Sequence, residues 1–357
     1  MSNAKDLARP EIRNLRPYRP AQYKDDLLRL NANETPWRPA GDNSADGLNY
    51  YPEVRPFRLL ETLAMHYGID PGQVLVTRGS SDAIDLLIRC FCRPAEDDIL
   101  ICPPTFGMYE VYAQLQGAGI IQVPLDAQQG YTLDLAGIEA ALSPRTKLLF
   151  VCSPNNPTGN RISTGQIDSA CRAIKGNGLV VVDAAYIEFS SSDPTRELLD
   201  RYDNIVILRT LSKAFGLAGI RCGAVLASPE IIDLVGCILP PYVYPTPCAD
   251  AALAGLGAGE ELNQRIATLC RERQRVSEAL VNLPGVEQVL PSEANFVLVR
   301  ASAPARLVAA AKEGGILIRD FSWDPFTPGC LRITIGAPAQ NDQLLKALAG
   351  QRNEAES

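Results

Sequence analysis

The middle of the chain alternates short apolar runs with stretches whose apolar residues recur at helical spacing. The run "QVLVT" at 73–77 is followed by "GSSDAIDLLIRCF", in which Ile84, Leu87, Ile88 and Phe91 fall on one helical face. Continuous apolar runs suit strands that are covered on both faces, as in a parallel sheet with crossover helices. The pattern predicts an α/β protein with a mostly parallel central sheet, with further strands at DDILIC (97–102), IIQVPL (120–125), KLLFVC (147–152), GLVVVD (178–183), NIVILRT (204–210) and RCGAVLA (221–227).

The pattern changes near residue 249. A long amphipathic helix is predicted over 260–283, and strand-like runs follow it at NFVLVRA (295–301), GILIRDF (315–321) and CLRITIG (330–336). This mixture predicts a smaller α+β domain over 249–357 beside a larger domain over 49–248. Residues 1–48 are rich in Pro and Asn and are predicted to form an irregular arm.

Charge and composition narrow the classes of function. The net charge of −7 argues against nucleic acid and anionic membranes as partners, because basic patches supply most of that attraction. No apolar run approaches the roughly 20 residues of a membrane helix, and no secretory signal is recognisable. The ten cysteines include no C-x-x-C pair, which favours reduced thiols and a cytoplasmic location. With His66 as the only histidine, no metal site is predicted, and proton transfer must use another group.

Polar side chains gather where predicted strands end. Asn156, Asp183 and Lys213 each lie at the end of such a strand or within a few residues of it, and so do Ser80 and Ser81. In open α/β sheets, ligands bind at the carboxyl ends of the strands. We therefore expect these residues to converge on one rim of the sheet although they are far apart in sequence.

Each residue at this rim has a chemical and a plain structural interpretation. Lys213 is either a solvated loop lysine or an amine kept neutral by desolvation and by the like charge of Arg221, and such amines form Schiff bases with aldehydes. Asp183 is either a satisfied strand end or a fixed negative charge facing a ligand cation. Ser80 and Ser81 open a helix, where they are simple N-caps or part of an anion site.

Pyridoxal phosphate has one group for each of these partners. Its aldehyde suits Lys213, and its protonated ring nitrogen suits Asp183. Its phenolic oxygen suits Asn156, which the turn "SPNNPTG" holds in place, together with Tyr186. Its phosphate suits the start of the helix with Ser80, Ser81, Ser212 and Arg221. The whole set therefore predicts a pyridoxal-phosphate site.

At these residues the chain resembles fold-type I pyridoxal-phosphate aminotransferases, and more narrowly histidinol-phosphate aminotransferases. The wider family is marked by "SPNNPTG" (153–159) and "TLSKAFGLAGIRCG" (210–223), and the narrower one by "LNANE" (30–34) and "YIEF" (186–189). The similarity runs nearly end to end, through RNLRPY, LNANETPW, YPE, RGSSDAIDLLIR, CPPTFGMYEVY, VVVDAAYIEF, NFVLVR and CLRIT.

The resemblance implies roles for individual residues. Lys213 bonds covalently to the cofactor and moves the Cα proton of the substrate, and Asp183 pairs with the pyridinium nitrogen. Asn156 and Tyr186 bond the ring hydroxyl, and Phe106 stacks on the ring where many relatives have Tyr. The phosphate would be held by Ser80, Ser81, Thr210, Ser212 and Arg221.

The resemblance also implies a homodimer with shared sites, because Tyr51 of "YPE" is similar to a tyrosine that reaches the phosphate from the partner subunit. The arm over 1–48 would join the small domain and cover the active site. One departure from the family is Ala184, which stands where an acidic residue is usual. We expect it to lie outside the immediate surroundings of the cofactor.

The implied reaction transfers an amino group between L-histidinol phosphate and 2-oxoglutarate, giving imidazole acetol phosphate and L-glutamate in histidine biosynthesis. Arg332 matches an arginine that binds the acceptor carboxylate, and Arg319 would be a second clamp for the substrate phosphate, unless it is a surface charge. Tyr18, Asn33 and Glu34 would close over the substrate. Two alternatives stay open, an aromatic or broad-specificity aminotransferase and a threonine-phosphate decarboxylase-like enzyme.

Overall fold

The structure, a computed structural model, describes residues 4–16, 18, 20–21 and 27–350. Its larger part is built on a seven-stranded sheet of order β1-β7-β6-β5-β4-β2-β3. The five strands from β6 to β3 are parallel, and only β7 runs against its neighbours β6 and β1. The α/β class with a mostly parallel sheet is thus confirmed, with strands at β1 (Val74–Thr77), β2 (Asp98–Ile101), β3 (Gly119–Gln122), β4 (Thr146–Cys152), β5 (Leu179–Asp183), β6 (Ile205–Thr210) and β7 (Gly223–Ala227).

Both faces of this sheet are covered by helices, which explains why its strands are apolar without alternation. Along β4, Leu149 and Val151 enter one core and Leu148 and Phe150 enter the other. The first core is closed by α3 (Phe57–Tyr67), α6 (Leu135–Ala141), α7 (Thr164–Ala173) and α8 (Thr195–Arg201). The second is closed by α4 (Ser80–Phe91), α5 (Met108–Gln116) and α9 (Pro229–Ile238).

A smaller unit is built on a four-stranded antiparallel sheet of order β10-β11-β9-β8. Its core contains residues of the helices α11 (Gly259–Val281), α12 (Pro304–Glu313) and α13 (Pro338–Ala349). The prediction of a strand over 315–321 is wrong for most of that range. A turn at Gly315 (φ 76°) follows α12, and hydrogen-bonded strand pairing begins only at Arg319. The strands are β8 (Val286–Val289), β9 (Phe296–Ala301), β10 (Arg319–Asp320) and β11 (Cys330–Thr334).

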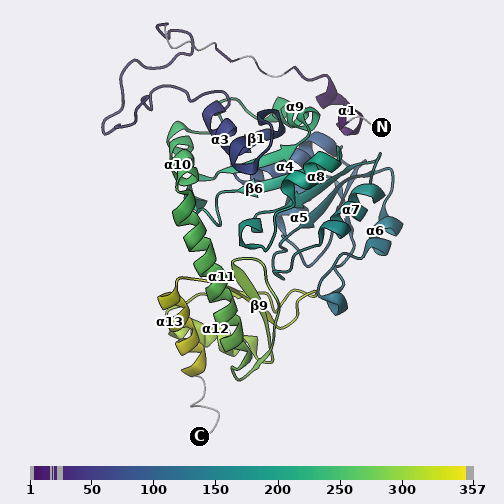
Figure 1. The fold of residues 1–357 in the computed structure, drawn as a ribbon. Coiled ribbons are helices and arrows are strands. Elements are labelled where there is room, and N and C mark those ends of the chain that lie inside the picture. Colours follow the sequence, from purple (N-terminus) through teal and green to yellow (C-terminus); the bar gives the residue numbers. More distant parts are fainter. Residues whose placement is uncertain (1–3, 17, 19, 22–26, 351–357) are drawn as a thin grey trace.

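Two helices connect the units. α10 (Thr246–Gly257) packs against α3, and its Ala252 is buried in a core of the large sheet. α11 then runs from the large unit down to α12 and α13, as Figure 1 shows. Residues 249–257 therefore pack with the large unit, beyond the boundary predicted at 248. None of the described helices has the length and apolar character to cross a membrane.

The described residues of the N-terminal arm lie on the outside of the large unit, and most of them lie above α3 in Figure 1. Its first helices, α1 (Ala4–Leu7) and α2 (Pro10–Arg13), pack against α9, and the backbone N–H of Arg9 donates to the carbonyl of Cys90 at 3.1 Å. The beginning of the arm therefore joins the large unit, whereas the arm was predicted to join the small one.

Candidate active site

The predicted rim residues meet in one pocket. It lies at the carboxyl ends of β4, β5 and β6, which are level with one another because Cys152 pairs with Asp183, and Asp183 with Leu208. The pocket is lined by all ten residues that were assigned to the cofactor within one subunit, Ser80, Ser81, Phe106, Asn156, Asp183, Tyr186, Thr210, Ser212, Lys213 and Arg221, and also by Cys152, Ala185 and Ala218.

One end of the pocket is rich in hydrogen-bond donors. The helix α4 begins there at Ser80, with its free N–H groups and the positive end of its dipole. The Arg221 Nη1 donates to Ser212 Oγ at 3.4 Å, and Thr210 Oγ1 donates to the same oxygen at 3.0 Å. A cationic guanidinium, hydroxyl groups and a helix N-terminus together form a site for an anion such as a phosphate.

The backbone is shaped to bring Arg221 to this end. Arg221 has a φ of 56°, in the left-handed region that residues with a Cβ rarely adopt. Gly79, just before α4, has a φ of 89°, and a Cβ there would lie 2.8 Å from the Arg221 Nη2. The backbone conformation at 79 therefore favours glycine, and the missing Cβ leaves room for the Arg221 guanidinium as it is placed here.

Opposite charges stand at the centre of the pocket. Asp183 is 3 % exposed, and burial raises its pKa to about 6 although a hydrogen bond from Tyr109 acts in the opposite direction. Lys213 is reachable by solvent through the open pocket, but the surrounding walls desolvate its ammonium. This desolvation and the charge of Arg332 lower the pKa of Lys213, and Asp183 raises it. The Lys213 Nζ lies 5.6 Å from the centre of the Tyr186 ring.

The turn "SPNNPTG" uses its two asparagines differently. Asn155 holds the turn together, because its Nδ2 donates to the Pro104 carbonyl at 2.8 Å and to Thr158 Oγ1 at 2.7 Å. Asn156 is left to face the pocket, where its Oδ1 accepts a hydrogen bond from Arg332. The first asparagine is therefore structural and the second is available for a ligand.

The two candidate substrate arginines lie side by side on neighbouring strands, since Arg319 of β10 pairs with Arg332 of β11. The Arg332 guanidinium carbon lies 5.3 Å from the ring centres of both Phe296 and Phe321, and that of Arg319 lies 5.8 Å from Phe321. Burial and the neighbouring Arg319 lower the pKa of Arg332, while Tyr186 raises it. Two adjacent cations beside Asn156, each close to an aromatic ring, form a pair that suits an anionic ligand.

The candidate residues of the arm do not line the pocket of their own chain. Tyr18 is 68 % exposed, and Asn33 is also exposed. Glu34 is occupied within the arm, because its carboxylate pairs with Arg29 at 2.6 Å and accepts from the backbone N–H of Tyr51 at 2.7 Å. The Tyr51 ring stacks on Tyr242 with 4.8 Å between ring centres.

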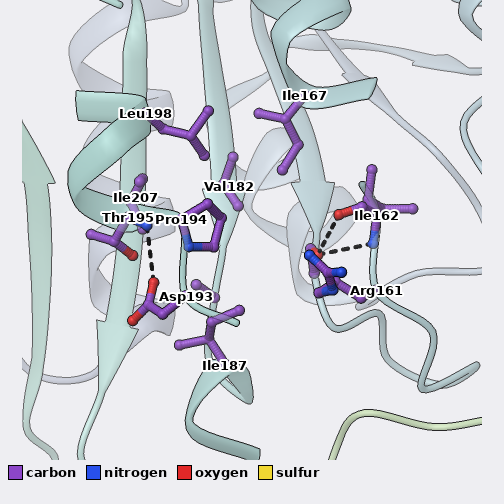
Figure 2. A pocket seen from close by; sticks show the side chains of 12 residues that line it. Arg161, Ile162, Ile167, Val182, Ile187, Asp193, Pro194, Thr195, Leu198 and Ile207 are labelled. Carbon is purple, nitrogen blue, oxygen red and sulfur yellow. Dashed lines mark hydrogen bonds between the residues drawn. The ribbon is translucent and has the colours of Figure 1, made fainter. Parts of the chain in front are cut away.

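Ala184 lies away from this pocket and lines a second, smaller cavity between β5, β6 and the helices α7 and α8. Figure 2 shows the apolar side chains of Ile167, Val182 and Leu198 in this cavity, with Asp193 and Arg161 at its edge. Ala184 is therefore absent from the lining of the large pocket, and it was predicted to lie outside the immediate surroundings of the cofactor.

Sequence reasoning missed Tyr109, whose hydroxyl donates to Asp183 Oδ2 at 2.9 Å. The only signal for it was its place in "CPPTFGMYEVY", three residues after Phe106. It also missed the backbone N–H of Ala185, which donates to Asp183 Oδ1 at 3.3 Å. The contact from Tyr109 depends on how α5 packs on the sheet, so it leaves no pattern of its own in the sequence. The contact from Ala185 is local and comes from the backbone turn that follows β5.

Comparison with known proteins agrees with this geometry. The chain is 44 % identical over 354 residues to a histidinol-phosphate aminotransferase of Xanthomonas axonopodis pv. citri, with 97 % of both chains covered. The structure resembles that of histidinol-phosphate aminotransferase from Sinorhizobium meliloti in complex with pyridoxal-5'-phosphate, with a TM-score of 0.76, 25 % identity and coverage of 84 % of this chain and 82 % of that one.

A second solved structure of similar fold belongs to a protein named for a different reaction. It is L-threonine-O-3-phosphate decarboxylase from Porphyromonas gingivalis, with a TM-score of 0.71, 25 % identity and coverage of 85 % of this chain and 91 % of that one. Residues 26–348 match the family model described as aminotransferase class I and II. The chain therefore belongs to the class I and II aminotransferase family.

Proposed function

We propose that this chain is a histidinol-phosphate aminotransferase, which transfers an amino group between L-histidinol phosphate and 2-oxoglutarate with pyridoxal phosphate as cofactor. The observation that carries the proposal is the meeting of Lys213, Asp183 and a phosphate-type donor set at one sheet edge. The high identity of the Xanthomonas relative over nearly the full length supports the choice of substrate.

The pocket fits the cofactor group by group. Asp183 is a buried carboxylate that faces the pocket, and it suits a cationic ring nitrogen. The end formed by α4, Ser212 and Arg221 suits a phosphate. Asn156 and Tyr186 would bond the ring hydroxyl, and Phe106 would lie against the ring. Bound pyridoxal phosphate supplies an aldehyde for covalent attachment and a ring that accepts electron density from the substrate Cα.

Lys213 has two tasks in this proposal. Its lowered pKa leaves more of the amine neutral, so it would serve as the nucleophile toward the cofactor aldehyde. Once free, the same nitrogen would accept the Cα proton of the substrate and return it later in the transfer. A single lysine performs both steps, which suits a pocket whose lining contains no histidine.

Arg332 and Arg319 hold the anionic end of each substrate. The phosphate of histidinol phosphate carries more charge than the carboxylate of 2-oxoglutarate, so it gains more from the second guanidinium. Arg332 is already directed toward the pocket by its bond to Asn156. Tyr18 and Asn33 would cover the substrate, and Glu34 would act through its hold on the backbone of Tyr51.

A homodimer with shared sites completes the proposal. The arm and the start of α3 expose a series of large apolar side chains, which a monomer rarely leaves uncovered. Tyr51 itself is 52 % exposed and would reach the phosphate of the partner subunit. A second copy would cover this surface, defined here by Leu27, Leu28, Leu30, Trp37, Leu48, Tyr50, Tyr51 and Phe57.

The structural similarity to the Porphyromonas decarboxylase favours one competing function, which is the removal of CO2 from a phosphorylated amino acid. A panel of amine compounds separates the possibilities. Protein saturated with pyridoxal phosphate should form glutamate from 2-oxoglutarate fastest with histidinol phosphate, and more slowly with phenylalanine or tyrosine. Release of CO2 from threonine phosphate without 2-oxoglutarate would identify a decarboxylase. Faster reaction with the aromatic amino acids would identify an aromatic aminotransferase.

A further inference from the structure

Tyr109 is a buried phenol that the proposed reaction does not yet use. It lies on α5 with its side chain fully buried, and its hydroxyl donates to Asp183 Oδ2 at 2.9 Å. The backbone N–H of Ala185 donates to the other carboxylate oxygen at 3.3 Å. Each oxygen of Asp183 therefore has one partner from the protein, and these two contacts fix the plane of the carboxylate while leaving lone pairs for a ligand.

The Tyr109 ring is held on two sides by other aromatic rings. It stacks on Phe150 of β4, with ring centres 4.7 Å apart and planes 17° apart. Phe106, which lines the pocket, meets it edge to face at 5.7 Å and 86°. Both arrangements are favourable for aromatic pairs. The hydroxyl is therefore carried by a ring that cannot swing away from Asp183 without breaking two contacts.

The direction of the hydrogen bond is fixed as well. Burial and the negative charge of Asp183 raise the pKa of Tyr109 well above its ordinary value. The phenol therefore keeps its proton and acts as the donor, while Asp183 accepts. A donor of this kind stabilises the charged form of the carboxylate, which burial otherwise disfavours.

We propose that Tyr109 is a positioning residue, which keeps the Asp183 carboxylate charged and directed at the cofactor ring nitrogen. The aromatic set Phe106–Tyr109–Phe150 supplies the rigidity for this. The inference rests on the proposed function, because it takes the role of Asp183 toward the ring nitrogen as given. It adds a partner for that aspartate from α5, a helix that packs on the central sheet.

The test measures binding of pyridoxamine phosphate, which keeps the ring nitrogen and phosphate but has no aldehyde for Lys213. Tyr109→Phe removes only the hydroxyl and should weaken this binding about tenfold, which is about 1.4 kcal/mol. The kcat for histidinol phosphate should fall, while its KM stays within about twofold, because the substrate arginines are untouched. Tyr131→Phe, which removes another buried phenol oxygen outside the pocket, should leave binding and kcat unchanged.

A double-mutant cycle separates positioning from packing. With Asp183→Asn already present, Tyr109→Phe should have little further effect on pyridoxamine phosphate binding. An equal loss in both backgrounds would overturn the proposal, because it would show that the hydroxyl acts on the fold and not on the carboxylate. Phe150→Leu keeps the hydroxyl but removes the stacked ring, and it should weaken binding by a smaller factor.

The two proposals fail in different ways. Wild-type protein that binds pyridoxamine phosphate and makes glutamate, together with a Tyr109→Phe variant that matches it in binding and kcat, would refute only the role of Tyr109. Wild-type protein that makes no glutamate from any amine would refute the proposed function.

Discussion

Glu293 gives the sharpest test of how the two units are joined. It lies between β8 and β9 of the small unit, and its carboxylate accepts from Ser190 Oγ and from the N–H and Oγ of Ser191, at 2.8 and 2.9 Å for the latter two. Arg161 adds an ion pair at 3.4 Å. Ser190 directly follows the turn that carries Tyr186 and ends at Phe189, so one carboxylate ties the small unit to the pocket wall.

The perturbation is Glu293→Gln, which keeps the size of the side chain and removes its charge. Hydrogen bonds from Ser190 and Ser191 lower the pKa of Glu293 from 4.5 to about 2 against the effect of burial. That change corresponds to about 3 kcal/mol at neutral pH. The side chain is 30 % exposed, and the glutamine oxygen still accepts one bond, so we expect a loss of about 1–2 kcal/mol.

The pH dependence has a definite sign. Because folding lowers the pKa of Glu293, its contribution is fully present above about 4.5 and is lost as the pH falls toward 2. Urea unfolding of both proteins should therefore give a stability difference that is constant from pH 8 to 5 and shrinks below that. Glu287→Gln, at an exposed position of β8, is the matched control and should change little. A Glu293→Gln variant as stable as wild type at pH 7 would refute the reasoning.

Three further predictions concern the pocket and its support. Lys213→Ala should abolish glutamate formation in a protein with an unchanged circular dichroism spectrum, and near-normal turnover would remove the mechanism. Arg319→Ala should raise the KM for histidinol phosphate more than the KM for 2-oxoglutarate, and equal effects would contradict the phosphate clamp. Arg209 is 2 % exposed and pairs with the buried Glu188 at 2.9 Å and with the more exposed Asp193 at 2.6 Å. Arg209→Met should therefore cost about 3–5 kcal/mol in urea unfolding, mainly because it leaves the Glu188 carboxylate buried and unpaired, and a loss below 1 kcal/mol would contradict this.

The sequence predicted the central sheet well because its strands are buried on both faces and read as unbroken apolar runs. The same property hid the direction of β7, since burial on both faces looks alike in parallel and antiparallel strands. β8 went unrecognised because two adjacent polar residues stand between its two valines and the strand is only partly buried. The apolar residues at 315–318 led to the opposite error, a strand predicted where none forms, because Leu317 is apolar yet 89 % exposed.

The pocket could be predicted as far as strand ends determine it. Asp183 and Lys213 follow strands of one parallel set, so topology alone brings them to one edge. Tyr109 and Glu293 act through packing between elements that are distant in sequence, and nothing in their local sequence distinguishes them from other buried or loop residues. For the arm, its composition predicted irregular backbone but could not say which unit its first helices would contact.

The helix α11 belongs to both lobes of the molecule at once. Its 23 residues span about 35 Å, with Leu262 near one end in a core of the large sheet and Val276 and Leu280 near the other in the core of the small one. A chain cut before this helix would remove Leu262 from a core of the larger lobe. A chain cut after it would remove Val276 and Leu280 from the core of the smaller lobe. The two lobes therefore share one helix as part of both hydrophobic cores, and neither half should fold as a separately expressed fragment.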